Sequence, residues 1–212
     1  MKNLYIVGSS GLAREIAQLV KQINDTKTTY NFLGFITDNK DEVGMEILYG
    51  KIVGNDAWLI DKKEECSIII GIGFPQIRAK LFKKYSEYEY FNFPNLLHPT
   101  TIFDFDTNVL GKGNILTAGC IFTNNIKIGD NNLFNLNCTI GHDSIISNSN
   151  VINPTCCISG NVELGDCNLL GTGAQVLEKV KIGNSTIIGG GSLVRKPVSD
   201  NTRVAGVPAK EF

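Results

Sequence analysis

The sequence predicts a Rossmann-like α/β domain followed by an all-β domain that is a left-handed parallel β-helix. Over the first 95 residues, short apolar runs that end in glycine alternate with amphipathic stretches of helical spacing. Over the rest of the chain, a large apolar residue returns at every sixth position. We therefore expect two domains, residues 1–95 and residues 96–212.

The first half of the chain alternates between expected strands and expected helices. Buried parallel strands are short and almost wholly apolar, whereas a helix that covers a sheet carries apolar residues three or four positions apart. Strand–helix–strand order predicts a small, mostly parallel sheet with right-handed crossovers. The expected strands are NLYIVG (3–8), NFLGFITDN (31–39) and CSIIIGIG (66–73), and the expected helices are SGLAREIAQLVKQIN (10–24) and PQIRAKLFKKYSEY (75–88).

The second half follows a strict period of six, which neither a helix nor a single strand explains. Hexapeptide repeats are typical of a β-solenoid, and three of them form one triangular coil of a left-handed parallel β-helix. A small or β-branched residue often stands four positions after the large one, as this fold requires. The apolar series is Leu110, Leu116, Phe122, Ile128, Phe134, Ile140, Ile146, Ile152, Ile158, Leu164, Leu170, Val176, Ile182, Ile188 and Val194.

Residues 18 apart stack in neighbouring coils, about 4.8 Å from one another. A stacked column of asparagines predicts a ladder of side-chain amides. A stacked column of cysteines predicts small, buried and reduced packing residues. The two columns are Asn114, Asn132, Asn150 and Asn168, and Cys120, Cys138 and Cys156.

Composition indicates an ordinary globular protein with no general affinity for nucleic acid. The 212 residues carry a net charge of −1, and lysine and arginine are scattered along the chain. The N-terminus has no apolar stretch long enough for a secretory signal or a membrane span. We therefore expect a cytoplasmic location, reduced cysteines, no nucleic-acid partner and no membrane span.

No metal site is expected. Cys156 and Cys157 are neighbours on an expected strand, so their side chains point to opposite faces, whereas zinc ligands converge. The chain has only two histidines, His98 and His142, which excludes a three-histidine zinc site of the carbonic anhydrase kind.

His142 is the candidate residue for proton transfer. It is the third residue of the hexapeptide IGHDSI, so it is expected near an edge of the prism and outside the apolar core. An exposed imidazole beside the carboxylate of Asp143 is suited to accept a proton near neutral pH.

The order of motifs along the chain resembles the sugar acyltransferases of the NeuD/PglD type. The motifs are YIVGSSGLAREIAQL, GFITDN, IGIGFPQIRAKL, LLHPT, the hexapeptide array and VAGVPAK. Members of that family acetylate sialic acids or nucleotide-linked amino sugars. The resemblance implies that residues 1–95 bind the nucleotide-sugar and that the β-helix binds acetyl-CoA between the subunits of a homotrimer.

The resemblance also implies roles for individual residues. It makes His142 the catalytic base and Asp143 its acidic partner. It assigns acetyl-CoA contacts to Gly160, Gly189, Gly190 and Lys210, and nucleotide-sugar contacts to Gly8, Ser9, Ser10, Gly11, Asp38, Asn39, Gly73 and Phe74. The sequence departs from the family pattern at Leu12, where a histidine is usual, at Phe74, where a small polar residue is common, and at Val151, where a second histidine is usual.

These observations lead to the hypothesis of an acetyl-CoA-dependent enzyme that acetylates the amine of a nucleotide-linked amino sugar, without a metal. Acetylation of a sugar hydroxyl, as in the sialic-acid branch, stays open, because the sequence does not separate the two reactions. A subunit that binds sugar nucleotides without catalysis also stays open. A nucleotidyltransferase is disfavoured, because the first 95 residues are short and lack a metal-binding carboxylate pattern.

Overall fold

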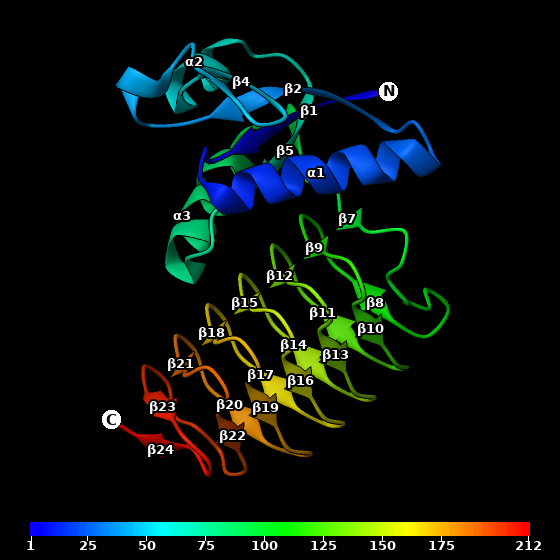
Figure 1. Ribbon diagram of the computed structural model, residues 1–212, viewed down its shortest axis with the longest axis vertical. Coiled ribbons are helices and arrows are strands. Elements are labelled where there is room, and N and C mark those ends of the chain that lie inside the picture. Colours follow the sequence, from blue (N-terminus) through cyan, green and yellow to red (C-terminus); the bar gives the residue numbers. More distant parts are fainter.

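The computed structural model describes all 212 residues and begins with an α/β domain (Figure 1). Its sheet has the strand order β3-β4-β2-β1-β5-β6, and every pairing except that of β3 with β4 is parallel. The elements are β1 (Lys2–Val7), α1 (Gly11–Thr26), β2 (Tyr30–Ile36), a 3₁₀ helix η1 (Lys40–Glu42), β3 (Glu46–Ile47), β4 (Gly50–Gly54), α2 (Asp56–Asp61), β5 (Cys66–Ile70), α3 (Pro75–Ser86) and β6 (Phe91–Asn92).

The predicted strands and helices of this half are present, and the expectation of a mostly parallel sheet is confirmed. All five residues of β5 are buried, as its continuous apolar run requires. Between β2 and β5 the structure adds β3, β4 and α2, which were not predicted. These elements are two to six residues long, and so short a segment leaves too few side chains for a periodic pattern to be recognised.

The second half is a left-handed parallel β-helix, as predicted, and each of its strands except the three-residue β23 has two residues. Its strands are β7 (Leu96–Leu97), β8 (Val109–Leu110), β9 (Ile115–Leu116), β10 (Ile121–Phe122), β11 (Lys127–Ile128), β12 (Leu133–Phe134), β13 (Thr139–Ile140), β14 (Ile145–Ile146), β15 (Val151–Ile152), β16 (Cys157–Ile158), β17 (Glu163–Leu164), β18 (Leu169–Leu170), β19 (Gln175–Val176), β20 (Lys181–Ile182), β21 (Ile187–Ile188), β22 (Leu193–Val194), β23 (Arg203–Ala205) and β24 (Lys210–Glu211).

The strands form the three faces of a prism. The first face contains β7, β9, β12, β15, β18, β21, β23 and β24; the second contains β10, β13, β16, β19 and β22; the third contains β8, β11, β14, β17 and β20. From β9 to β22 the chain visits the first, second and third faces in turn, and each visit ends in a short turn at an edge. The second residue of each strand from β8 to β22 is the apolar residue of the hexapeptide series, and all of these are buried except Leu110, which is half-buried.

Both predicted columns are present inside the prism. The side-chain oxygen of Asn132 accepts the backbone N–H and the amide of Asn150, and the same oxygen of Asn150 accepts the backbone N–H of Asn168. Since these side chains are fully buried, the ladder satisfies polar groups that water does not reach. Cys156 is fully buried while its neighbour Cys157 is exposed, as strand alternation predicts.

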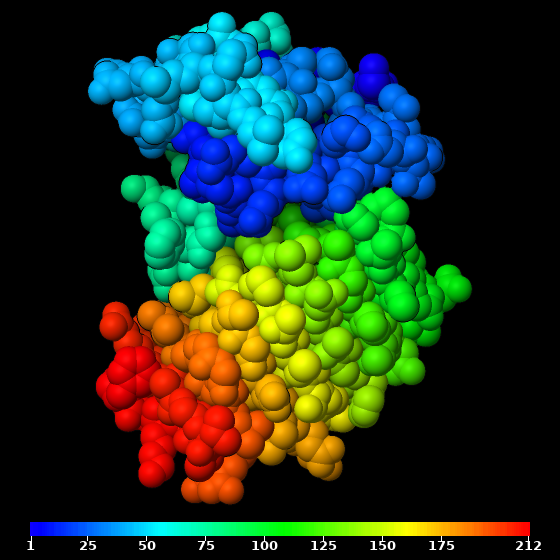
Figure 2. Space-filling model, in the orientation of Figure 1, coloured from blue at the N-terminus to red at the C-terminus, as the bar shows by residue number.

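Helix α1 lies between the α/β sheet and the first face of the prism (Figure 1), and its atoms rest directly on the coils (Figure 2). Ile16 and Val20 of α1 share one buried cluster with Ile115, Leu133 and Val151, the first residues of β9, β12 and β15. Val151, where a histidine is usual in the family, is therefore a packing residue between the two halves. No helix of the chain is both long and apolar enough to span a membrane.

Candidate active site

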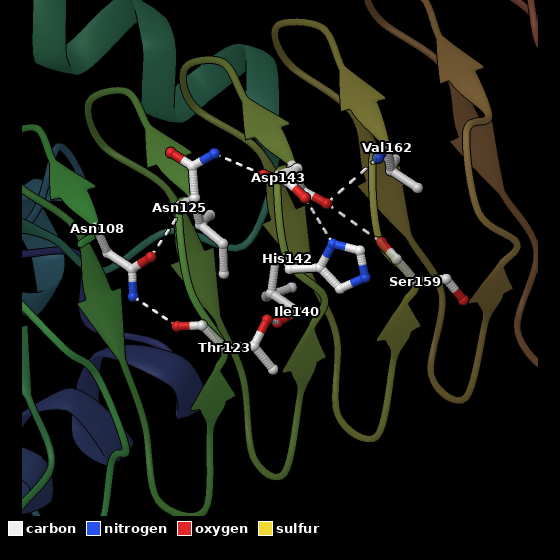
Figure 3. A network of polar contacts seen from close by, with 10 residues as sticks. Asn108, Thr123, Asn125, Ile140, His142, Asp143, Ser159 and Val162 are labelled. Atoms are coloured by element: carbon white, nitrogen blue, oxygen red, sulfur yellow. Dashed lines mark hydrogen bonds and ion pairs between the residues drawn. The ribbon is translucent and has the colours of Figure 1, made fainter.

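His142 lies on the turn after β13, at the edge between the second and third faces, and is exposed (Figure 3). Its Nδ1 lies 2.7 Å from Oδ2 of Asp143. An ionised carboxylate only accepts hydrogen bonds, so Nδ1 carries the proton and Nε2 is left with a free lone pair. This tautomer is the one that a base acting through Nε2 needs.

The carboxylate of Asp143 is held from two sides. His142 bonds one oxygen, and Nδ2 of Asn125, one coil earlier, donates to the other at 2.5 Å. These hydrogen bonds, that of His142 first, lower the pKa of Asp143 below its usual value. Asp143 has a φ of 59°, in the left-handed region where aspartate and asparagine are among the better-tolerated residues. The backbone of the turn thus fixes the position of the Asp143 side chain, and the hydrogen bonds of His142 and Asn125 fix the orientation of its carboxylate.

Gly160 lies under the imidazole of His142, at the same edge one coil later. A β-carbon added at Gly160 would lie 2.7 Å from both Cε1 and Nε2 of the ring. The backbone N–H of Gly160 makes no hydrogen bond within the chain, whereas the N–H of Asn161 donates to the carbonyl of His142. The structure therefore brings His142, Asp143 and Gly160 together, and glycine at position 160 leaves room for the ring.

The other residues expected to contact acetyl-CoA lie elsewhere on the prism. Gly189 and Gly190 follow β21, at the edge between the first and second faces. The N–H of Gly189 donates to Val204 in β23, and Lys210 in β24 pairs with the neighbouring Ala205. These residues are close to one another, but the second face separates their edge from that of His142 and Gly160.

The residues expected to contact a nucleotide-sugar gather at one end of the α/β sheet. They occupy the turns at the carboxyl ends of β2, β1 and β5, which are neighbours in the sheet. Ligands of open α/β sheets bind at this end. Gly8 has a φ of 122°, and its N–H donates to the carbonyl of Ile36 in β2. The N–H of Gly71 donates to the carbonyl of Val7 in β1. The turns that carry the expected residues are Gly8–Gly11, Asp38–Asn39 and Gly73–Phe74.

Glu42 of η1 joins two of these turns and was not predicted. Ser9 Oγ donates to Glu42 Oε2 at 2.7 Å, and Asn39 Nδ2 donates to Oε1 at 3.1 Å. These hydrogen bonds, that of Ser9 first, lower the pKa of Glu42. No local pattern marks this residue, because the contact joins positions 33 apart in the sequence.

A cavity of about 590 Å³ lies at the opposite end of the sheet. It is lined by the amino-terminal residues of β1 and β5 together with Phe93 and Lys112, and it includes none of the expected site residues. No group of three histidine, cysteine, aspartate or glutamate side chains is arranged to hold a metal ion.

The N-terminal half of the chain is similar to a known protein family. Residues 3–85 match the PglD N-terminal domain family. A comparison with curated protein sequences found no match.

Solved structures match the chain over its whole length. PerB from Caulobacter crescentus, in complex with CoA and GDP-perosamine, is 25% identical with a TM-score of 0.90, over 100% of this chain and 98% of that one. A histidine mutant of the perosamine N-acetyltransferase from the same organism is 24% identical with a TM-score of 0.91, over 100% and 97%. The acetyltransferase domain of PglB from Neisseria gonorrhoeae, in complex with acetyl coenzyme A, is 22% identical with a TM-score of 0.88, over 100% and 99%.

These similarities confirm the predicted resemblance to NeuD/PglD-type sugar acyltransferases and the predicted fold. The assignment of individual residues to contacts with acetyl-CoA or a nucleotide-sugar stays a prediction.

Proposed function

We propose that the protein transfers an acetyl group from acetyl-CoA to the amine of a nucleotide-linked amino sugar. The observation that carries this proposal is the pair of His142 and Asp143, exposed at a prism edge with Nε2 beside Gly160. Supporting it, the similar structures from Caulobacter crescentus hold CoA and GDP-perosamine.

The proton transfers follow from the geometry of the pair. Nε2 of His142 accepts a proton as the sugar amine attacks, because only the neutral amine is nucleophilic. The imidazolium so formed keeps its Nδ1–H bond to Asp143, which stabilises the positive charge. Acetyl-CoA supplies an already activated thioester: the C–N bond forms as the C–S bond breaks, and the CoA thiolate leaves and takes the proton from the imidazolium. No cysteine of the chain is therefore needed as a nucleophile. The unpaired N–H of Gly160 is our candidate donor to the developing oxyanion.

We assign the acetyl-CoA site to the space between subunits of a homotrimer. Gly160 lies at one edge of the second face, whereas Gly189, Gly190 and Lys210 lie at its other edge. If one protomer presents the first edge to a neighbour that presents the second, all four residues contact one acetyl-CoA molecule. Dissociated protomers are then expected to be inactive. Sedimentation and activity assays at decreasing protein concentration test whether activity is lost as the trimer dissociates.

We assign the nucleotide-sugar to the turns at the carboxyl ends of β1, β2 and β5. These turns present backbone N–H groups near the start of α1, where the helix dipole favours a phosphate. The hydrogen bonds of Ser9 and Asn39 to Glu42 hold two of the turns at a fixed spacing.

The decisive experiment is an assay of thiol release from acetyl-CoA against UDP-, dTDP- and GDP-linked amino sugars and free sialic acid. We expect release with at least one nucleotide-linked amino sugar, and a loss of roughly 10²- to 10⁴-fold on His142→Asn. His98→Asn is the matched control, since the imidazole of His98 bonds only Thr100 and is expected to be dispensable. Near-normal turnover of His142→Asn would contradict the role of His142 as the general base. Acetylation of sialic acid alone would favour transfer to a hydroxyl, and binding without thiol release would favour a non-catalytic subunit.

A further inference from the structure

Asn125 occupies the turn position that lies 18 residues before Asp143, at the same prism edge. The same position in successive coils is held by Asn125, Asp143, Asn161 and Lys179, all with φ between 53° and 62°. Left-handed backbone alone accounts for an asparagine here, because asparagine is among the residues that tolerate it best. Asn161 shows this simple case, since its side chain makes no hydrogen bond within the chain while its N–H bonds the carbonyl of His142.

The side chain of Asn125 makes a further contact that the turn does not require. Its Nδ2 lies 2.5 Å from Oδ1 of Asp143, the oxygen that His142 does not use (Figure 3). The contacting atom of the amide must be the nitrogen, since a carboxylate has no proton to donate. Each oxygen of Asp143 thus has one donor, which fixes the rotation of the carboxylate about its own axis.

We propose that Asn125 is a positioning residue for the proposed base, and that Asn125, Asp143 and His142 act as one chain of hydrogen bonds across two coils. This inference rests on the proposed function. Asn125 does not contact the imidazole of His142, and it acts on the ring through Asp143. By holding Oδ1 it aims Oδ2 at Nδ1 of His142, and so keeps the proton on Nδ1 and the lone pair on Nε2.

The groups around the carboxylate limit what else could orient it. Its flanking positions in the column, Asn125 and Asn161, do not titrate, and the hydrogen bonds that lower its pKa come from His142 and Asn125. The nearest charged member of the column, Lys179, stands two coils away from Asp143. Removing the side chain of Asn125 therefore deletes one of the two hydrogen bonds to Asp143 while leaving the charge of the site and the imidazole of His142 in place.

The test compares Asn125→Gly with Asn161→Gly in the full-length protein. Glycine accepts the positive φ at both positions, so the two variants delete an amide without straining the turn. We expect Asn125→Gly to lower kcat about tenfold, a typical loss for a residue that orients a functional side chain. Asn161→Gly is expected to retain the wild-type kcat. Equal kcat values for the wild type and Asn125→Gly, or an equal loss in both variants, would overturn the proposal.

Nitrogen NMR of the imidazoles gives a readout that needs no substrate. The chain has only two histidines, and the Nδ1 of His98 accepts the N–H of Thr100, which requires the opposite tautomer to that of His142. His98 therefore serves as an internal reference. We expect His142 to carry its proton on Nδ1 in the wild type, and to show a larger share of the Nε2–H tautomer in Asn125→Gly.

A third variant, Asn125→Asp, keeps the shape of the side chain and replaces the donor by a second carboxylate. We expect it to lower kcat more than Asn125→Gly, because the two carboxylates repel each other. Wild-type activity in Asn125→Asp would contradict the proposal. If the proposed function fails because His142→Asn stays active, the tautomer measurement still decides whether Asn125 orients Asp143 and the ring.

Discussion

The guanidinium of Arg78 in α3 bonds both the main-chain oxygen and the side-chain oxygen of Asn131 in the β-helix, at 3.0 to 3.2 Å. The same group donates to the carbonyls of Ile70 and Ile72, at the end of β5. Arg78 is fully buried, and carbonyl oxygens take the place of water around its charge. One side chain thereby joins the turn that carries Gly73 and Phe74 to the prism.

Replacing Arg78 by methionine is expected to destabilise the protein by about 2–4 kcal/mol, because buried carbonyl oxygens lose their donors. Lysine should restore little, since an ammonium does not reproduce the planar fork that serves several acceptors at once. Chemical denaturation measures both variants. Arg14→Met, on the exposed side of α1, is the control and should stay within about 0.5 kcal/mol of the wild type.

Gly160→Ala is expected to reduce turnover at least about tenfold while the fold is retained. The added β-carbon would lie 2.7 Å from Nε2 of His142, so the ring must turn away from Asp143. Thiol release and circular dichroism measure the two effects. In a His142→Ala background the same change should cost no further activity, because the ring is already absent. An additional loss in that background would show that Gly160 acts independently of the ring.

Asp143→Asn is expected to lower kcat by up to about 10⁴-fold, as when the carboxylate partner of a catalytic histidine becomes an amide. The pKa of Asp143 is lowered in the folded protein. The pair therefore stabilises the fold above about pH 4, and this contribution is lost as the pH falls through the lower folded pKa. Acid titration followed by circular dichroism should show this component in the wild type and not in Asp143→Asn.

Asn150→Ala is expected to destabilise the prism by about 1–3 kcal/mol, because the backbone N–H of Asn168 loses its buried acceptor. Asn148→Ala removes a similar contact, in which Oδ1 accepts the N–H of Asp130. Asn148 is exposed, so water can replace it and the cost should be small. Equal losses in the two variants would show that burial does not set the strength of the ladder.

Much of the candidate site follows from spacing along the chain. The hexapeptide period places His142 near an edge, and the carboxyl ends of neighbouring parallel strands bring Ser9 and Asn39 to one end of the sheet. Asn125 stands 18 residues before Asp143 in the sequence. Because residues 18 apart stack in neighbouring coils, this spacing predicts their contact. Glu42 and Arg78 carry no such signal, because their partners come from segments without a shared repeat.

The sequence by itself determined the prism, because a strict period of six admits one register and turns the repeating apolar residue of each hexapeptide toward the interior. It also determined the pair of His142 and Asp143, which are neighbours in the chain. Only the tertiary structure decided that Val151 packs under α1, that Arg78 of α3 bonds Asn131 of the β-helix, and that Glu42 bonds Ser9. Each of these depends on which coil or helix lies opposite a residue, and local periodicity does not specify contacts between separate segments.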